Sequence, residues 1–390
     1  MTSIELTIEQ LRARRGTKWH RYPADVLPAW VADMDFAVPD SIQKAILDTV
    51  ESRDYGYGVG PGSRTGPDGV AQAFAERMAS RYDWIVEPER VLPTSELVQA
   101  MYGTVLAFSE PGDGIILHLP IYPPFLASVD QNGRRRVENL LVDNGTRFEI
   151  DFDALRKSID PSTRIWMFCN PHNPTGRAFT RAELEKVAEI AIERDLIVLC
   201  DEIHSDLMYA PNRHTPLASI SPEIAARTIT ITSATKSFNI PGLRCALMHF
   251  GSEDLQQRFN ARIPERLFGG LNSIGVDATV AAWRSSDDWL AEVMKILTAN
   301  RETVRKFTTE TVPAIKHRSP EATYLAWLDC SGLPVQGPAQ DFFLEKAKVA
   351  LNNGGDFGAQ FKHCVRLNFG TSPAILEQVL GRMQSAIAKL

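Results

Sequence analysis

The sequence predicts an α/β protein with a mostly parallel, doubly wound sheet in a large domain and a smaller α+β domain beside it. From about residue 68 to residue 250, short β-branched or apolar runs alternate with helical patterns, which is typical of such sheets. Three of these runs end directly in polar residues, at the place where open α/β sheets bind ligands. With 390 residues, the chain is long enough for two or three domains.

Residues 1–45 are expected to form an N-terminal arm and part of the small domain. A short amphipathic helix is predicted over Ile8 to Arg15, and the tryptophans and prolines of Trp19 to Phe36 indicate packing against a larger body. Asp40 is the predicted N-cap of a helix that runs to Ser52. The inward face of this helix is expected to carry Ile42, Ala45, Ile46 and Val50. The glycines and prolines of residues 55–67 indicate a loop.

Residues 46–275 are the predicted large domain, and residues 276–390 are the predicted small C-terminal domain. The strands expected in the large domain are Ile115–Leu119, Val137–Leu141, Ile165–Cys169, Leu196–Cys200, Thr228–Thr232 and Cys245–Phe250. Helices are expected over Ser95–Phe108 and Arg181–Arg194. A weakly broken helical region, about Gly275 to Glu310, leads into the small domain. The elements expected there are strands near Thr323–Leu328 and Val365–Asn368 and a last helix, Ile375–Lys389.

The overall composition disfavours nucleic acids and membranes as partners. The net charge is −6, so the chain carries no basic footprint that would indicate nucleic acid or an anionic membrane. Met1 to Arg15 lack the apolar core of a secretory signal, and no run approaches the roughly 18 apolar residues of a membrane span. The five cysteines form no CxxC pair, and Cys169 and Cys200 fall in apolar strand patterns, where reduced thiols are usual. These features favour a cytoplasmic location.

The first candidate site residue is Lys236, which follows the predicted strand Thr228–Thr232 and precedes Pro241-Gly242. A lysine just past a buried strand lies in a partly desolvated setting, which lowers its pKa and makes the neutral amine available for covalent chemistry with a carbonyl group. Most lysines are simply solvated loop residues, and one lysine alone would favour that interpretation.

Two further polar clusters change this balance. Asn170-Pro171-His172-Asn173-Pro174-Thr175-Gly176 follows one predicted strand, and Asp201-Glu202-Ile203-His204 follows the next. An aspartate at the end of a buried strand is costly unless a cation, such as a protonated ring nitrogen, pairs with it. Asp201 could instead cap a helix, and Asn173 could be a turn residue. Their joint spacing with Lys236 favours a site.

These clusters and other segments resemble a known family. The matching segments are Lys18-Trp19, LPAWVADMDF from Leu27, YGYG from Tyr55, PIYPPF from Pro120, NPHNPTG from Asn170, DEIH from Asp201, KSFN from Lys236, TYLAWLD from Thr323 and RLNFG from Arg366. Together they resemble fold-type I pyridoxal 5′-phosphate (PLP) enzymes of the class I/II aminotransferase superfamily. The WVADMDF segment narrows the resemblance to the branch of MalY/PatB-type cystathionine β-lyases, also called C–S lyases.

The resemblance implies roles for residues around the cofactor ring. Lys236 matches the lysine that carries PLP and removes the substrate Cα proton, and Asp201 matches the residue that keeps the pyridine nitrogen protonated. Asn173 matches the donor to the phenolic oxygen, and Tyr122 matches the aromatic side chain that stacks on the ring; without the family, Tyr122 would be read as core. The expected catalytic residues are therefore Lys236, Tyr122 and Asp201, with His204 as a further cofactor contact.

The resemblance also implies a phosphate end and a carboxylate end. The residues matched to the phosphate site are Ser95, Glu96, Leu97, Ser233, Arg244 and, from the neighbouring subunit of a homodimer, Tyr57. Glu96 stands where relatives commonly carry a small residue, so we expect its carboxylate to turn outward while its amide donates. Arg366 matches the arginine that binds the substrate α-carboxylate, and Ala32 and Asp33 are expected to border the substrate. The segment Gly60–Pro67 is longer than is usual in the family.

Three functions remain open at this point. The resemblance favours β-elimination from L-cystathionine or a related cysteine S-conjugate, which gives thiol, pyruvate and ammonia. A PLP-dependent aminotransferase acting on an L-amino acid and a 2-oxo acid would use the same residues for the first steps, so only the lyase-branch segments separate the two. A PLP-binding regulator is disfavoured because Lys236 is intact and no basic patch is present.

Overall fold

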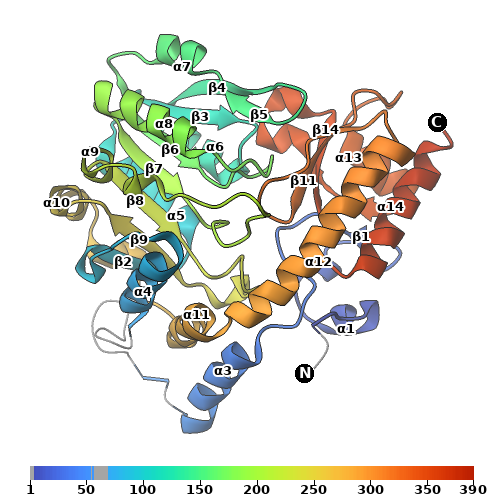
Figure 1. Ribbon diagram of the computed structural model, residues 1–390, viewed down its shortest axis with the longest axis horizontal. Helices are drawn as coiled ribbons and strands as arrows, with labels where there is room; N and C mark the ends of the chain where they lie inside the picture. Colours follow the sequence, from blue (N-terminus) through green and yellow to red (C-terminus); the bar gives the residue numbers. More distant parts are fainter. Residues whose placement is uncertain (1–3, 54, 57–68) are drawn as a thin grey trace.

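The computed structural model describes residues 4–53, 55–56 and 69–390 (Figure 1). Tyr57 and the segment Gly60–Pro67 lie outside the described residues. In the described part, no helix combines the length and the apolar character that crossing a bilayer requires.

An eight-stranded sheet forms the centre of the larger part of the molecule, with the order β2-β9-β8-β7-β6-β3-β4-β5. Its strands are β2 (Val91–Thr94), β3 (Gly114–Leu119), β4 (Arg135–Asp143), β5 (Phe148–Ile150), β6 (Thr163–Cys169), β7 (Ile197–Asp201), β8 (Thr228–Thr232) and β9 (Ala246–Phe250). The neighbours from β8 through β4 pair in parallel, whereas β9 is antiparallel to β8 and to β2, and β5 is antiparallel to β4. The α/β doubly wound class is therefore confirmed.

The strands have apolar side chains on both faces because helices cover both faces, as expected for a parallel sheet. In β6, Ile165 and Met167 pack on one side, and Trp166 and Phe168 pack on the other. The helices of the first side are α5 (Leu97–Phe108), α6 (Pro123–Asp130) and α10 (Glu253–Arg262). Those of the second are α7 (Phe152–Ser158), α8 (Arg181–Glu193) and α9 (Pro222–Ala225).

A second sheet, β10-β11-β14-β13, lies apart from the first (Figure 1). It is antiparallel and consists of β10 (Lys316–His317), β11 (Leu325–Asp329), β13 (Asn352–Asn353) and β14 (Cys364–Asn368). The long helix α12 (Asp287–Lys306) and the last helix α14 (Pro373–Ile387) pack against each other beside it. Short helical segments lie between its strands, among them α13 (Ala339–Phe342). The domain boundaries near residues 45 and 275 stay a prediction.

The N-terminal arm packs between these two parts. Its elements are α1 (Ile8–Ala13), α2 (Thr17–His20) and β1 (Leu27–Pro28), which pairs in parallel with β12 (Val349–Ala350). Lys18 and Asp35 form a buried ion pair, with 2.7 Å between Nζ and Oδ2. The Asn368 side chain donates to the Val31 and Asp33 carbonyls, at 2.6 and 2.7 Å. The predicted packing of the arm against a larger body is confirmed.

Helices α3 (Asp40–Ser52), α4 (Val70–Tyr82) and α11 (Ser273–Ser285) pack together at one end of the molecule. The prediction of Asp40 as N-cap is wrong, because Pro39 is the N-cap and Asp40 is the first helical residue. The prediction that Val50 faces inward is also wrong, because its exposed fraction is 44% while Thr49 is buried instead. The helical region after Gly275 is interrupted at Ser286, the junction of α11 and α12.

Candidate active site

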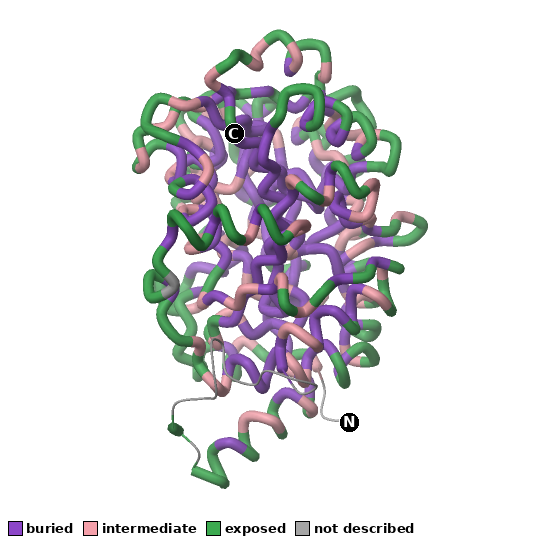
Figure 2. Tube along the Cα trace, turned by 90° about the vertical axis from the view of Figure 1, so that its left-hand side faces the viewer, coloured by how far each residue is buried: buried purple, intermediate pink, exposed green. Residues whose placement is uncertain are grey.

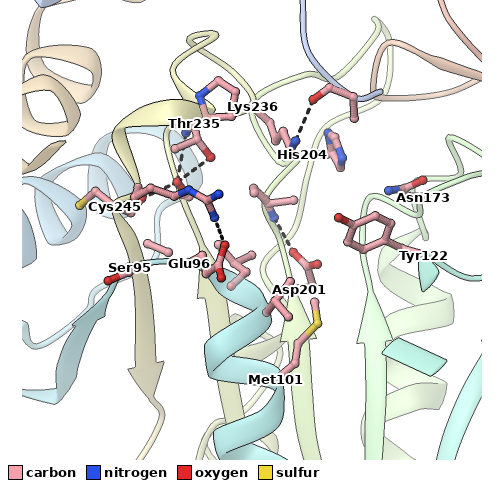
Figure 3. Close-up of a pocket in the computed structure, with 18 of the residues that line it drawn as sticks. Ser95, Glu96, Met101, Tyr122, Asn173, Asp201, His204, Thr235, Lys236 and Cys245 are labelled. Atoms are coloured by element: carbon pink, nitrogen blue, oxygen red, sulfur yellow. Dashed lines mark hydrogen bonds and ion pairs between the residues drawn. The ribbon is translucent and has the colours of Figure 1, made fainter. Parts of the chain in front are cut away.

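A pocket opens where β6, β7 and β8 end, bordered by the start of α5 and by the N-terminal arm (Figure 3). Eleven of the expected site residues line it: Ala32, Ser95, Glu96, Leu97, Tyr122, Asn173, Asp201, His204, Ser233, Lys236 and Arg244. Arg366 borders this group through Asn173, and Tyr57 lies outside the described residues. The structure thus brings together three clusters that are up to 66 positions apart in the chain, from Asn170 to Lys236.

Lys236 follows β8 and points toward the arm. Its Nζ donates a 2.7 Å hydrogen bond to the Ala32 carbonyl oxygen. Burial lowers the pKa of the Lys236 ammonium to about 8, although the nearby Asp33 and Asp201 carboxylates oppose that shift. A fraction of the amine is therefore neutral near neutral pH, as nucleophilic attack on a carbonyl requires.

Asp201 is the last residue of β7 and is buried. Its Oδ1 accepts a 3.0 Å hydrogen bond from the Ile203 amide. Burial raises the pKa of the Asp201 carboxyl to about 7, and the neighbouring Glu202 adds to the increase. A cationic ring nitrogen placed beside this carboxylate would keep it ionised, because opposite charges favour the charged form.

Asn173 and His204 face the pocket with hydrogen-bonding groups. The Asn173 Oδ1 accepts from Arg366 Nη1 at 2.9 Å, so the amide NH₂ is the part of the side chain left to serve as a donor. His204 is buried, and its Nδ1 has no hydrogen-bond partner among the described residues. Burial lowers the pKa of the His204 imidazole to about 3, so the ring is neutral and its orphaned nitrogen calls for a polar ligand atom.

Arg366, in β14, is a buried guanidinium with no carboxylate partner among the described residues. Besides Asn173, it donates through Nη2 to the Asn352 side chain at 2.6 Å and to the Trp30 carbonyl at 3.1 Å. Its Nε has no partner, and its Cζ lies 5.0 Å from the centre of the Phe357 ring. Burial lowers the pKa of Arg366 to about 10. A carboxylate ligand would supply the counter-charge that this arginine lacks.

The other end of the pocket can bind an anion. Helix α5 begins after Glu96, and no side chain caps its first amides, which remain as donors in the positive half of the helix dipole. Ser233 is less available than expected, because its hydroxyl already donates to the Cys245 carbonyl at 2.6 Å. The expectation that the Glu96 carboxylate turns outward is wrong: it lines the pocket and forms an ion pair with Arg244.

Two residues of the arm were expected beside the substrate. The Ala32 carbonyl accepts from Lys236 and also from the Tyr324 hydroxyl, at 3.1 Å. Asp33 is outside the group that lines the pocket; its carbonyl accepts from Lys18 Nζ at 2.9 Å, and burial raises the pKa of its carboxyl. A direct contact of Asp33 with substrate stays a prediction.

The sequence alone did not identify several residues that complete the pocket wall. They are Val98, Met101, Cys169, Ile203, Thr235, Pro241, Cys245 and Ala246. Met101 lies one helical turn after Leu97, a spacing that places both on one face of α5 and could have suggested it. Cys245 and Ala246 reach the pocket only because β9 pairs with β8, and no local pattern indicates that pairing.

The donor set fits PLP. A neutral amine suits its aldehyde, a buried carboxylate suits its ring nitrogen, and the orphaned His204 nitrogen with the Asn173 amide suits its phenolic oxygen. Tyr122 lines the same pocket and offers a ring face, and the open start of α5 suits its phosphate.

Comparison with known proteins supports this fit over most of the chain. Residues 32–383 match the model of the family "Aminotransferase class I and II". The chain is 35% identical to cystathionine β-lyase PatB of Bacillus subtilis (strain 168) over 388 residues, covering 97% of this chain and 98% of PatB.

Two solved structures are also similar. The crystal structure of OvoB superposes with a TM-score of 0.92 at 34% identity, covering 100% of this chain and 99% of that one. Cystalysin of Treponema denticola, whose crystal structure contains a PLP cofactor, has a TM-score of 0.91 at 27% identity, with 100% and 99% covered. Given the family match over most of its length and this agreement in fold, the chain belongs to the class I and II aminotransferase family.

Proposed function

We propose that the protein is a PLP-dependent carbon–sulfur β-lyase that cleaves L-cystathionine or a related cysteine S-conjugate to thiol, pyruvate and ammonia. The observation that best supports an amino-acid substrate is the state of Arg366. Its guanidinium is buried and lacks a carboxylate partner among the described residues. The choice of lyase over transaminase is supported by the near full-length similarity to PatB of Bacillus subtilis.

The proposed roles follow from the geometry of the pocket. PLP, when bound, supplies an electron sink for the electron pair left when the Cα–H bond breaks. Arg366 binds and orients the α-carboxylate through a planar fork. Lys236, as the neutral amine, takes the proton from Cα. Asp201 holds the proton on the pyridine nitrogen, and Tyr122 packs on the ring face.

Loss of the sulfur group follows proton removal in the lyase. In a transaminase, Lys236 would instead return the proton to the cofactor carbon. Both outcomes use the same four residues, so the aminotransferase remains the second candidate, favoured by the family to which the chain belongs.

The deciding experiment measures pyruvate and thiol released from L-cystathionine by the PLP-loaded protein, with and without an added 2-oxo acid. Stoichiometric pyruvate without an oxo acid supports the lyase. Activity that requires the oxo acid, with conversion of the cofactor to its pyridoxamine form, would contradict the lyase and support the aminotransferase. Lys236→Ala is the control and should be inactive in both assays.

We also propose a homodimer, with α3 in the interface. This helix extends from the body at the lower end of the molecule (Figure 1, Figure 2). It exposes Leu47 and Val50, each with a 44% exposed fraction, and Tyr55 just beyond it has 62%. Exposed apolar side chains grouped on one projecting helix are typical of a contact surface.

A further inference from the structure

Glu96 is the one acidic side chain at the phosphate end of the pocket among the described residues that line it. Glu96 is the N-cap of α5, yet its side chain makes no capping hydrogen bond. Glutamate is also not among the side chains that stabilise this position, which are Ser, Thr, Asp and Asn. A capping hydrogen bond therefore does not explain a glutamate here.

Its carboxylate instead forms an ion pair with Arg244 at this end of the pocket, drawn as a dashed line from Glu96 in Figure 3. Arg244 follows the short helical turn Pro241–Leu243, has a left-handed backbone at φ 52°, and lines the pocket. The side chains of the pair keep exposed fractions of 46% for Glu96 and 59% for Arg244, so neither is fixed by surrounding core. The pair is free to rearrange when an anion arrives.

Arg244 is the cation on which the phosphate would depend. The only cationic side chains among the described residues that line the pocket are Lys236 and Arg244, since His204 is neutral. Lys236 donates to the Ala32 carbonyl, and its amine would bind the cofactor aldehyde, so it is not available to the phosphate. The Ser233 hydroxyl is occupied by the Cys245 carbonyl. The Arg244 charge is thus shared between Glu96 and any phosphate group at α5.

We propose that Glu96 competes with the cofactor phosphate for Arg244 and thereby sets how tightly the protein holds PLP. A phosphate dianion that enters this end must draw Arg244 away from Glu96 and must then lie beside an uncompensated carboxylate, and both effects weaken binding. The proposal concerns the phosphate and not the reaction. A refuted role of Glu96 would therefore leave the proposed lyase activity untouched, and a refuted lyase activity would leave the role of Glu96 untouched.

The test is a titration of cofactor-free protein with PLP and, separately, with pyridoxal, which lacks the phosphate, followed by absorbance. In Glu96→Gln, the dissociation constant for PLP should fall by roughly threefold to tenfold, the size expected for a part-exposed charge interaction. The dissociation constant for pyridoxal should not change. The matched control is Glu110→Gln, which removes the carboxylate from another part-exposed pair, with Arg262, away from the pocket.

A second set of variants tests whether Arg244 is shared between Glu96 and the phosphate. Arg244→Gln should weaken PLP binding by a larger factor in the Glu96→Gln background than in the native background, because only there is the whole charge of Arg244 available to the phosphate. If Arg244→Gln weakened PLP binding by the same factor in both backgrounds, the proposed competition between Glu96 and the phosphate would be refuted. Weaker or unchanged PLP binding in Glu96→Gln, or an equal gain for pyridoxal, would overturn the role of Glu96.

Discussion

At the scale of single residues, Arg366 illustrates how a buried charge can be held ready for a ligand. Three oxygen atoms of the protein accept from its Nη groups, but none belongs to a carboxylate. The arrangement orients the guanidinium and leaves its charge uncompensated until the substrate arrives.

Replacement of Arg366 by lysine should therefore act mainly on substrate binding. Lysine keeps the charge but loses the planar fork, so KM for L-cystathionine should rise by roughly tenfold to a hundredfold. Steady-state kinetics would measure this, and the absorbance of bound PLP should stay the same. Arg305→Lys, at an exposed pair with Glu302, is the control. An unchanged KM in Arg366→Lys would argue against carboxylate binding at this position.

Asp201 gives a prediction for the pH dependence of stability in the cofactor-free protein. Its pKa is about 7 in the folded state, above the roughly 4 of an unfolded aspartate, so the folded state binds the additional proton between these values. The free energy of unfolding should therefore fall as pH rises from about 4 to 7, by up to about 4 kcal/mol, and then level off.

Urea unfolding of native protein and of Asp201→Asn, at pH 5 and pH 8, isolates this contribution. The decrease between the two pH values should be smaller in Asp201→Asn by most of that amount. Added PLP should also reduce the decrease in the native protein, because a cationic ring nitrogen stabilises the ionised carboxylate. Equal decreases in the native and variant proteins would show that Asp201 does not titrate in this range.

At the scale of elements, the Asn170–Gly176 loop is held by hydrogen bonds to the segment that precedes β11 of the small sheet. The Gly176 carbonyl accepts from the Glu321 and Ala322 amides, at 2.8 and 3.0 Å. Gly176 has φ +68°, and a Cβ added to it would lie 2.2 Å from the Pro320 Cβ. The loop that carries Asn173 therefore has no room for a side chain at its end.

Gly176→Ala should lower the free energy of unfolding by roughly 2–4 kcal/mol, from the positive φ and the overpacking together. Gly145→Ala is a matched control, because Gly145 also has a positive φ, +94°, but a Cβ there would have no neighbour within 4 Å. The control should lose only about 1 kcal/mol. Chemical denaturation of both variants measures the difference, and equal losses would refute the role of the Pro320 contact.

Long apolar elements were predictable from sequence, whereas short ones were not. The runs before Asn170 and Asp201 gave strands that end within one residue of β6 and β7, because continuous apolar residues require burial on both faces. The three residues of β5 and the two of β1 are too few to show any periodicity. Their pairing depends on partners distant in sequence, which no local pattern encodes.

The same division holds for the site. Lys236, Asp201 and Asn173 could be named because each lies at or just after the end of a strand, and parallel strands end at one edge of the sheet. The hydrogen bond from Ser233 to the Cys245 carbonyl and the inward direction of Glu96 could not be predicted, because each depends on a tertiary contact with Arg244 or Cys245 that no local pattern indicates.

At the scale of the whole molecule, the proposed homodimer places α3 at a subunit boundary. The double variant Leu47→Glu, Val50→Glu should shift the protein to monomers in analytical ultracentrifugation, because two charges would have to be buried in the contact. Leu140→Glu, Val142→Glu is the control, since these residues of β4 are exposed to 50% and 48%. Dissociation of the control variant alone would place the interface at β4 and contradict the assignment to α3.

The two hydrogen bonds to the Ala32 carbonyl have a mechanical consequence. One comes from Lys236, which follows the large sheet, and the other from Tyr324, directly before β11 of the small sheet. This single peptide oxygen therefore links a residue that follows β8 of the large sheet to the residue that precedes β11 of the small sheet. A displacement of one sheet relative to the other would stretch at least one of the two hydrogen bonds.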